Sequence, residues 1–223
     1  MAVNTLSYNL VRARRKTLAL VIRDDGSLEV RAPHHYPLDS IERFIMEKSA
    51  WVIKKRAHVL SRPKAPTRRY EEGEYFPYLG KDYPLLFSAN AKKIYAGSAL
   101  IVPQRYRKNP KSALLRWYKE EAYRIIEERT KVFARRFGFS WRTISINSAT
   151  RRWGSCNSRG SLNFSYRLVM APQDLVDFVI LHELCHTIHH NHSSAFYHAL
   201  ATVLPDHKER DLRLKLIGRV LVL

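Results

Sequence analysis

Cysteine is scarce in this sequence of 223 residues and occurs only at Cys156 and Cys185. Two cysteines are too few for the disulfide framework of a small secreted domain. No apolar run reaches the roughly 18–20 residues that a membrane-spanning helix needs. Residues 1–16 also lack a charged start followed by a long apolar run and a small-residue cleavage site, so we expect no signal peptide. These absences predict a soluble, cytoplasmic protein without a membrane partner.

Acidic residues are also few, because 20 Asp and Glu stand against 39 Lys and Arg, for a formal net charge of +19. A basic surface attracts polyanions, so nucleic acid or a nucleotide is a candidate partner. Charge alone names no target, and the alternative is that the basic residues only keep the protein in solution. The hydrophobic fraction of 45% is that of a folded globular protein rather than of a disordered chain.

The first half of the chain predicts a β-hairpin followed by a helix. Apolar side chains alternate within residues 16–33 on both sides of Asp25-Gly26, where glycine accepts a positive φ. A helix is expected to open at residues 38–40 and to continue through Val52, because apolar residues recur at helical spacing. Trp51 is expected to anchor this helix on the hairpin.

The rest of the sequence predicts a linker, short strands and further helices. Residues 61–73 are rich in proline and charge and are interpreted as a linker or an exposed crossing. The other expected elements are strands near 83–87 and 100–102, a long helix from Asn109-Pro110 to Gly138, strands around 144–146 and 162–164, a helix from Pro172 to about His190, and a final helix from Asp206 to about Ile217.

Five of the ten histidines lie within residues 182–192, HELCHTIHHNH. The preceding helix is apolar on nearly every face, which is typical of a buried helix, and unpaired polar groups there would cost several kcal/mol. His182 and His186 are four residues apart and therefore share one helix face. Two such imidazoles can bind one ion, while Glu183 can accept a proton from a water on that ion. The alternative is a pair of hydrogen-bonded core histidines.

A catalytic metal site usually has three protein ligands. On a continuous helix His189 and His190 would stand roughly 10–12 Å along the axis from His182, too far for the same ion. We therefore favour His192, with Asn191 ending the helix in the left-handed conformation and turning the chain back. The alternatives are His198, His207 and a distant carboxylate.

Three imidazoles suit Zn²⁺, although Mn²⁺, Co²⁺ or Ni²⁺ can occupy the same ligands. Neither cysteine has the paired spacing of a structural zinc site. Cys185 is interpreted as a small buried thiol rather than as a ligand, and Cys156 is a weak candidate for ligand or nucleophile.

The sequence from Arg151 to Tyr197, with RWGSC, LNFSYRL, HELCH and NHSSAF, resembles the YgjP-like family of predicted metal-dependent hydrolases, zincin-fold relatives of SprT-like and WLM-type metallopeptidases. RRKTLALVIRDDGSLEVRAP and FIMEKSAWVIKK extend the resemblance over nearly the whole chain. The resemblance implies metal ligation by His182, His186 and His192, with Glu183 as the catalytic carboxylate. The family commonly has a Phe-Trp pair where this chain has Phe196-Tyr197.

With this resemblance, the expected fold class is α+β. We expect a zincin-like catalytic domain over residues 109–223, carrying the HExxH helix. A β-rich N-terminal region over residues 1–108, with one helix, precedes it.

Substrate contacts are expected from the loop that carries RRWGSC and from the strand after it. SLNFSY is interpreted as a strand along the edge of the cleft, where an extended peptide can pair with it. Arg152, Trp153 and Asn163 are the candidate substrate-binding residues. Arg151 and Arg159 are further candidates for an acidic or phosphorylated substrate. The alternative is a Trp153 packed in the core and solvated arginines.

The sequence thus predicts a zinc-dependent peptidase in which Glu183 activates a water on the metal. A second hypothesis is hydrolysis of a phosphoanhydride, for instance in a nucleotide, at the same site. A third is a nucleic-acid-associated protein that acts on DNA-bound proteins.

Overall fold

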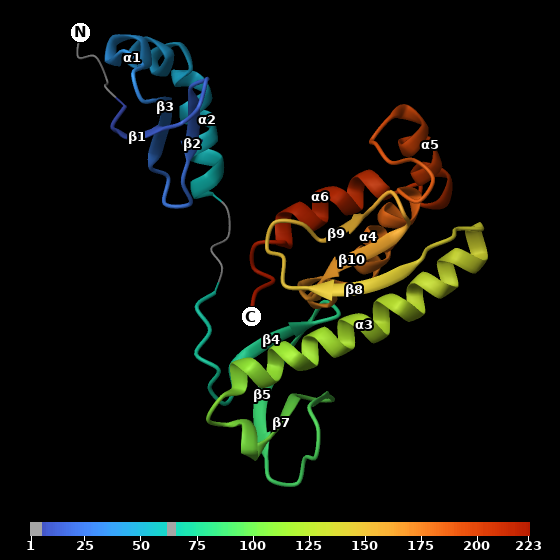
Figure 1. Ribbon diagram of the computed structural model, residues 1–223. Coiled ribbons are helices and arrows are strands. Elements are labelled where there is room, and N and C mark those ends of the chain that lie inside the picture. Colours follow the sequence, from blue (N-terminus) through green and yellow to red (C-terminus); the bar gives the residue numbers. More distant parts are fainter. Residues whose placement is uncertain (1–5, 62–65) are drawn as a thin grey trace. The chain divides into compact units, whose positions relative to one another are not determined.

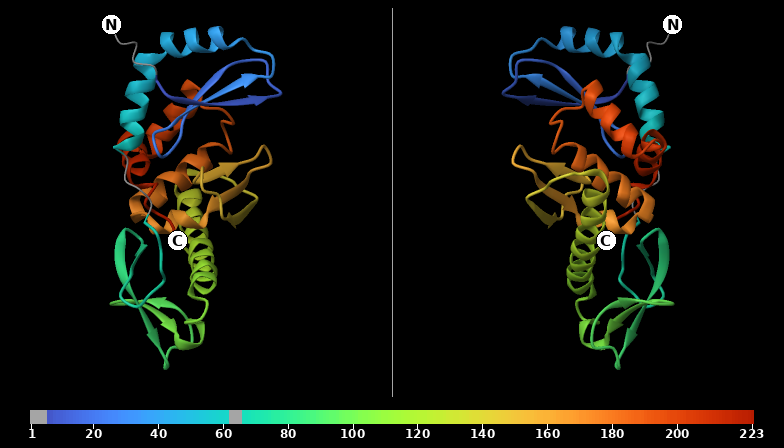
Figure 2. Two further views of the ribbon diagram at one scale, coloured as in Figure 1. Left: turned by 90° about the vertical axis from the view of Figure 1, so that its left-hand side faces the viewer. Right: turned by 90° about the vertical axis from the view of Figure 1, so that its right-hand side faces the viewer.

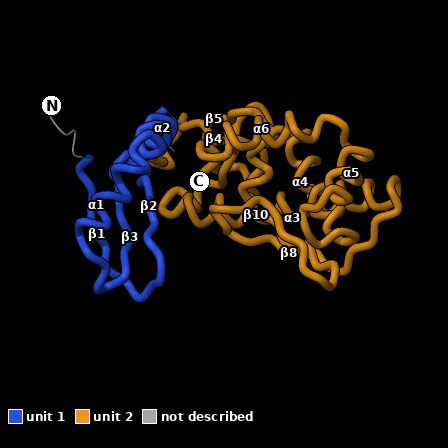
Figure 3. Tube along the Cα trace, turned by 90° about the horizontal axis from the view of Figure 1, so that it is seen from above, with its two compact units in different colours: residues 1–63 blue, residues 64–223 orange. Residues whose placement is uncertain are grey.

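The computed structural model describes residues 6–61 and 66–223, which divide into two compact units, residues 1–63 and residues 64–223 (Figure 3). The division falls within the proline- and charge-rich segment that the sequence marks as a linker. Its residues 62–65 lie outside the described residues. Both units combine helices with sheets, so the expected α+β class is confirmed.

Unit 1, residues 1–63, contains a three-stranded sheet of order β1-β3-β2 (Figure 1). The strands are β1 (Tyr8–Ala13), β2 (Ala19–Ile22) and β3 (Leu28–Pro33). The predicted hairpin is confirmed, because β2 and β3 are antiparallel and Gly26 between them has a φ of 83°. The sequence analysis missed β1, which pairs parallel to β3.

Two helices follow in unit 1, where one was predicted: α1 (Leu38–Glu47) and α2 (Ser49–Leu60), separated at Lys48. Their apolar faces pack on β3 in a small core that includes Val30, Ile41 and Val52. Trp51 is not part of this core and is 47% exposed, so the prediction that it anchors the helix is wrong.

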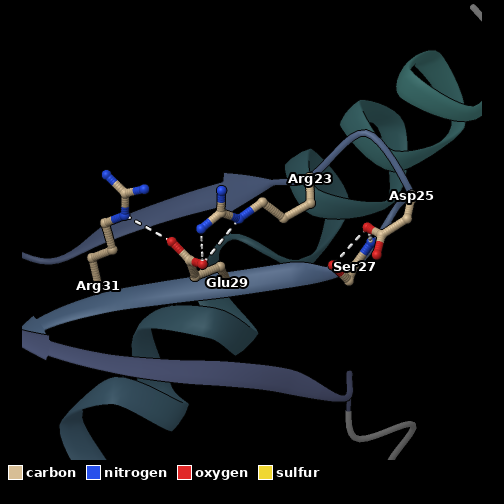
Figure 4. A network of polar contacts seen from close by, with 5 residues as sticks. All are labelled: Arg23, Asp25, Ser27, Glu29 and Arg31. Carbon is tan, nitrogen blue, oxygen red and sulfur yellow. Dashed lines mark hydrogen bonds and ion pairs between the residues drawn. The ribbon is translucent and has the colours of Figure 1, made fainter.

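On β3, Glu29 is a buried carboxylate held by two arginines (Figure 4). Arg23 forms an ion pair with Oε2 of Glu29, and Nε of Arg31 donates to Oε1 at 2.8 Å. These two hydrogen bonds hold the pKa of Glu29 below its ordinary value of 4.5. Both arginine side chains are partly exposed, so these ion pairs lie at the surface of unit 1.

Unit 2, residues 64–223, begins with a small sheet of order β4-β5-β7-β6. The strands are β4 (Tyr75–Tyr78), β5 (Lys81–Ser88), β6 (Tyr95–Ala96) and β7 (Leu100–Pro103), followed by the 3-10 helix η1 (Gln104–Tyr106). The expected strands near 83–87 and 100–102 are present. The buried hydroxyl of Tyr118 donates to the carbonyl of Pro77 at 2.7 Å, which ties this sheet to the helix that follows. The compact units therefore divide near residue 63, whereas the sequence analysis placed a boundary at residues 108/109.

The longest helix, α3 (Pro110–Phe137), begins and ends where the sequence predicts. Asn109 caps its start by accepting from the backbone N–H of Ser112, and Gly138 ends it with a left-handed φ of 74°. One face of α3 lies in the main core, and Figure 2 shows the β4–β7 sheet at the beginning of this helix.

A second sheet, of order β8-β10-β9, follows α3. Its strands are β8 (Thr143–Asn147), β9 (Gly154–Cys156) and β10 (Ser161–Ser165). β10 pairs parallel to β8 and antiparallel to β9, so both of its edges are occupied. β8 and β9 are therefore the two edge strands of this sheet, and the expectation that a peptide pairs with SLNFSY is wrong.

The last part of unit 2 is helical: η2 (Tyr166–Met170), α4 (Gln173–Cys185), α5 (Ser194–Val203) and α6 (His207–Ile217). The turn at Leu79 and Gly80 docks on the chain just before α4, because their amides donate to the carbonyls of Val169 and Met170. A Cβ on Gly80 would lie 2.8 Å from the Cα of Pro172, so glycine permits this approach. The β4–β5 turn thereby fixes the start of α4.

Arg167 in η2 is buried and is held by carbonyl groups. Its guanidinium donates to the carbonyl oxygens of Thr150, Gly218 and Leu221 at 2.6–2.8 Å. It also lies 5.0 Å from the ring centroid of Trp153. Three distant segments of unit 2 are therefore joined through one side chain.

None of the described helices combines the length and the apolar character needed to cross a membrane.

Candidate metal centre

Three histidines converge at the end of α4. Nε2 of His192 lies 3.1 Å from Nε2 of His182 and 3.2 Å from Nε2 of His186. His182 lies in the last turn of α4, and His186 is the residue that follows the helix. Among the described residues, these three form the group of His, Cys, Asp and Glu side chains close enough to bind one metal ion. His198 and His207, the alternative third ligands, are not part of it.

The turn that returns His192 differs from the predicted one. α4 ends at Cys185 rather than near His190, and the amides of Ile188 and His189 both donate to the carbonyl of Cys185. No described non-glycine residue between 80 and 223 has a positive φ, so the predicted left-handed Asn191 is wrong. Successive turns over residues 186–191 reverse the chain with ordinary backbone angles, which is why neither Gly nor a left-handed Asn is needed.

His189, which the geometry of a continuous helix excluded as a ligand, contributes through its backbone. Its carbonyl accepts from Nδ1 of His186 at 2.9 Å. Because that carbonyl can only accept, the proton lies on Nδ1 of His186 and the lone pair lies on Nε2. Nε2 thus faces the other two imidazoles as an acceptor, in the tautomer that a metal ligand requires.

Phe196 supports all three imidazoles from α5. Its ring centroid lies 4.4 Å from that of His186 and 4.9 Å from those of His182 and His192. Phe196 is fully buried, and α5 is capped by Ser193, whose side chain accepts from the backbone N–H of Phe196. The sequence analysis did not assign this role, although Phe196 and Leu200 are the buried positions four residues apart on α5.

Glu183 is a buried carboxylate next to the histidines in sequence. Burial raises its pKa to about 8, against the opposing charge of Arg152. Burial, together with the imidazoles of His186 and His192, lowers the pKa of His182 to about 4. The site therefore disfavours charge on its own groups, which is typical of a water-poor functional centre.

Gly154 of β9 makes room for Glu183. A Cβ on residue 154 would lie 2.6 Å from Cγ and 2.7 Å from Oε1 of Glu183. The edge strand and the carboxylate are thus in direct contact. RWGSC contains this glycine, but only the structure shows what it meets.

The candidate substrate residues separate into different environments. Arg152 is exposed and close enough to Glu183 to lower its pKa. Trp153 packs beneath Arg167 and beside Gly218. Asn163 lies on the central strand β10, where its Oδ1 accepts from Nδ2 of Asn147 at 2.9 Å. Of the three residues, only Arg152 is an exposed side chain beside the carboxylate.

The cysteines are not part of the histidine cluster. Cys185 is fully buried, as predicted, and burial raises the pKa of its thiol to about 11. Cys156, on β9, is partly buried, and its Sγ lies 3.3 Å from the carbonyl of Asn157. Burial, and then the nearby Glu183, raise the pKa of Cys156, so its environment does not favour a thiolate ligand or nucleophile.

Comparison with known proteins gives one match to a family and one to a solved structure. No curated protein matches the chain. The crystal structure of the metallopeptidase zymogen of Pyrococcus abyssi abylysin aligns with a TM-score of 0.38 and 18% identity, covering 44% of this chain and 99% of that one. The model of the YgjP-like, metallopeptidase domain matches residues 16–216. Since this match spans most of the 223 residues, the protein belongs to the YgjP-like metallopeptidase family and is a metal-dependent hydrolase.

Proposed function

We propose that the protein is a zinc metallopeptidase in which His182, His186 and His192 bind the ion and Glu183 is the general base. The observation that carries this proposal is the approach of the three Nε2 atoms to 3.1 and 3.2 Å. Membership of the family implies a divalent metal, and the choice of zinc rests on the all-imidazole donor set.

The separations suit a zinc ion. Zinc–nitrogen bonds of about 2.0–2.1 Å at tetrahedral angles place two ligand nitrogens roughly 3.3 Å apart. The observed Nε2 separations are close to this value, and His186 already has the required tautomer. Exposed His192 leaves one side of the group open to solvent, as a catalytic site needs.

A divalent ion at this site supplies Lewis acidity, which lowers the pKa of a water molecule and polarises a peptide carbonyl. Glu183, adjacent to His182 in sequence, would accept the proton of the attacking water, and the positive charge of a bound ion would favour the ionised form of this carboxylate. It then returns that proton to the nitrogen of the departing amine. Phe196 fixes the imidazole rings, and the burial of Glu183 keeps bulk water away from the carboxylate.

An extended peptide has a place to pair beside Glu183. β9 is one of the two edge strands of its sheet, and its Gly154 touches the carboxylate. Strand addition to an exposed sheet edge supplies backbone hydrogen bonds without demanding a particular sequence. A peptide lying along β9 would pass the carboxylate of Glu183 with its carbonyl groups, and Arg152 would meet acidic side chains.

Elemental analysis together with a casein assay tests the proposal. We expect zinc and activity in the wild type, zinc without activity in Glu183→Gln, and neither in His192→Ala. His190→Ala is the matched control, because His190 is exposed and lies outside the cluster. Full activity of Glu183→Gln on casein would remove the role given to this carboxylate. Phosphate release from nucleotides, without cleavage of casein, would favour phosphoanhydride hydrolysis at the same site.

A further inference from the structure

A cavity separate from the histidine cluster lies in unit 2. It is formed by residues around β6, by η1 and by the first half of α3. Its volume is about 640 Å³, within the range of roughly 300–1,000 Å³ typical of small-molecule sites. None of its lining residues belongs to the histidine cluster. Figures 1 and 2 show the first half of α3 and β7 at the far end of unit 2 from α5.

Part of the lining of this cavity is apolar and buried. Ile94, Ala113 and Trp117 line it and are buried. The ring of Trp117 packs 5.0 Å from that of Tyr78.

One of the two carboxylates in the cavity is already neutralised. Glu121 accepts from the hydroxyl of Tyr78 at 2.6 Å and from Nη2 of Arg124 at 2.7 Å. Burial raises the pKa of the Tyr78 hydroxyl, so it stays a donor to this carboxylate. Glu120 is the other lining carboxylate and is exposed.

The cationic side chains of the cavity outnumber its remaining carboxylate. Besides Arg124, they are Lys92, Lys93, Arg105 and Arg116. Within residues 6–61 and 66–223, none of these four forms an ion pair with a carboxylate. Four cations facing one exposed Glu120 leave an uncompensated positive potential over a concave surface, where such a potential is strongest.

Two of these cations are held in place around one aromatic ring. The guanidinium carbon of Arg105 lies 4.7 Å, and that of Arg116 5.7 Å, from the ring centroid of Tyr106. Nη2 of Arg105 also donates to the carbonyl of Lys92 at 2.6 Å. The hydrogen bond and the charge of Arg105 lower the pKa of the Tyr106 hydroxyl. Both guanidinium groups thus lie against the same ring, and Arg105 has a fixed position.

We propose that this cavity binds an oligophosphate group, a chain of two or three phosphates that is either inorganic or part of a nucleotide. Guanidinium groups bind phosphate oxygens in a bidentate manner, and lysines add compact charges. A triphosphate carries several negative charges within a small volume, which matches four converging cations better than a single carboxylate does. The site binds this ligand away from the proposed zinc centre.

Isothermal titration of the full chain with inorganic triphosphate, ATP and citrate, at low salt and without divalent ions, tests this site. Triphosphate is expected to bind wild type, and citrate to bind much more weakly. The dissociation constant should rise roughly tenfold or more in Arg116→Gln and in Lys93→Gln, because each loses charge-assisted hydrogen bonds. Arg135→Gln is the matched control: the same charge change on the same helix, exposed and outside the cavity.

Equal affinity for triphosphate and ATP would identify the phosphate chain alone as the ligand, whereas tighter ATP binding would identify a nucleotide; both support the site. The proposal is overturned if wild type binds neither, if citrate binds as tightly as triphosphate, or if Arg116→Gln and Lys93→Gln both bind like Arg135→Gln. Binding must also persist in His182→Ala, since its loss there would move the ligand to the histidines. Lys93 and Arg116 are exposed, so these variants are expected to fold.

Discussion

The backbone of Gly154 touches the carboxylate of Glu183: a Cβ on residue 154 would come within 2.7 Å of Oε1. A single glycine on the edge strand β9 therefore sets where the proposed general base can lie. Through this contact, β9, the proposed substrate-binding strand, touches Glu183, the proposed general base.

Replacing Gly154 by alanine is expected to displace this carboxylate rather than to unfold the protein, because the atoms it meets are the flexible end of a side chain. We expect kcat/KM on a peptide substrate to fall roughly tenfold to a hundredfold, the cost of a misplaced general base. Zinc content and Tm should stay near wild type. Gly97→Ala is the control, since its Cβ would meet only Tyr95 at 3.6 Å. Unchanged peptide hydrolysis in Gly154→Ala would contradict the positioning role.

Zinc is expected to stabilise unit 2 through the three histidines. An ion that binds only the folded state raises stability with its concentration, here by about 5–10 °C in Tm at zinc well above its dissociation constant. The rise should vanish in His192→Ala and persist in His190→Ala, as followed by scanning calorimetry with and without a chelator. An equal rise in both variants would show that zinc acts elsewhere.

Arg167 is expected to be more important for stability than any exposed arginine. Its guanidinium serves three carbonyl groups, on Thr150, Gly218 and Leu221, and lysine cannot reach all three. Arg167→Lys should lower the free energy of unfolding of unit 2 by about 2–3 kcal/mol, because buried and part-buried carbonyls lose a charged donor. Arg159→Lys, an exposed change of the same kind, provides the comparison. Denaturant unfolding gives the difference, and equal midpoints would refute it.

Unit 1 is expected to lose stability in acid through Glu29. Its pKa is lowered in the folded state by the hydrogen bonds from Arg23 and Arg31. The ionised carboxylate therefore stabilises the fold above the ordinary pKa of 4.5, and this contribution is lost as the pH falls through the lower folded value. Glu29→Gln should make the stability of unit 1 less dependent on pH below about 4.5.

Hydrogen exchange of the β1–β3 amides in the full chain measures this dependence for unit 1 alone. Glu42→Gln, an exposed change on α1, should keep the wild-type pH dependence. If Glu29→Gln and wild type lose protection in parallel as the pH falls, the two arginines do not stabilise the fold through this carboxylate.

Several local features were predictable because their causes are local. Asn109 followed by Pro110, and the Gly138 that ends α3, act within one turn of the helix, and both were confirmed. The spacing of His182 and His186 likewise depends only on helix geometry. The parallel pairing of β1 with β3 joins segments separated by the β2 hairpin, and strand periodicity does not specify such a partner.

The surroundings of the histidines depended on contacts between distant segments. The end of α4 at Cys185, the contact of Gly154 with Glu183, and Phe196 beneath the imidazoles have no signature within one stretch of sequence. The boundary between the units shows the same limit. From sequence, residues 75–103 resemble a continuation of the β-rich N-terminal region. The hydrogen bond from the Tyr118 hydroxyl to the carbonyl of Pro77 instead connects them to α3.

The hydrogen bonds of Arg167 make Gly218 and Leu221 neighbours of the loop that carries Arg152, because the same guanidinium reaches Thr150. Gly218 also lies under Trp153, where a Cβ would come within 2.8 Å of the ring. A genetic screen for altered catalysis would therefore return substitutions at these late positions together with those in the histidine motif. Second-site suppressors of changes in residues 150–153 would arise there as well.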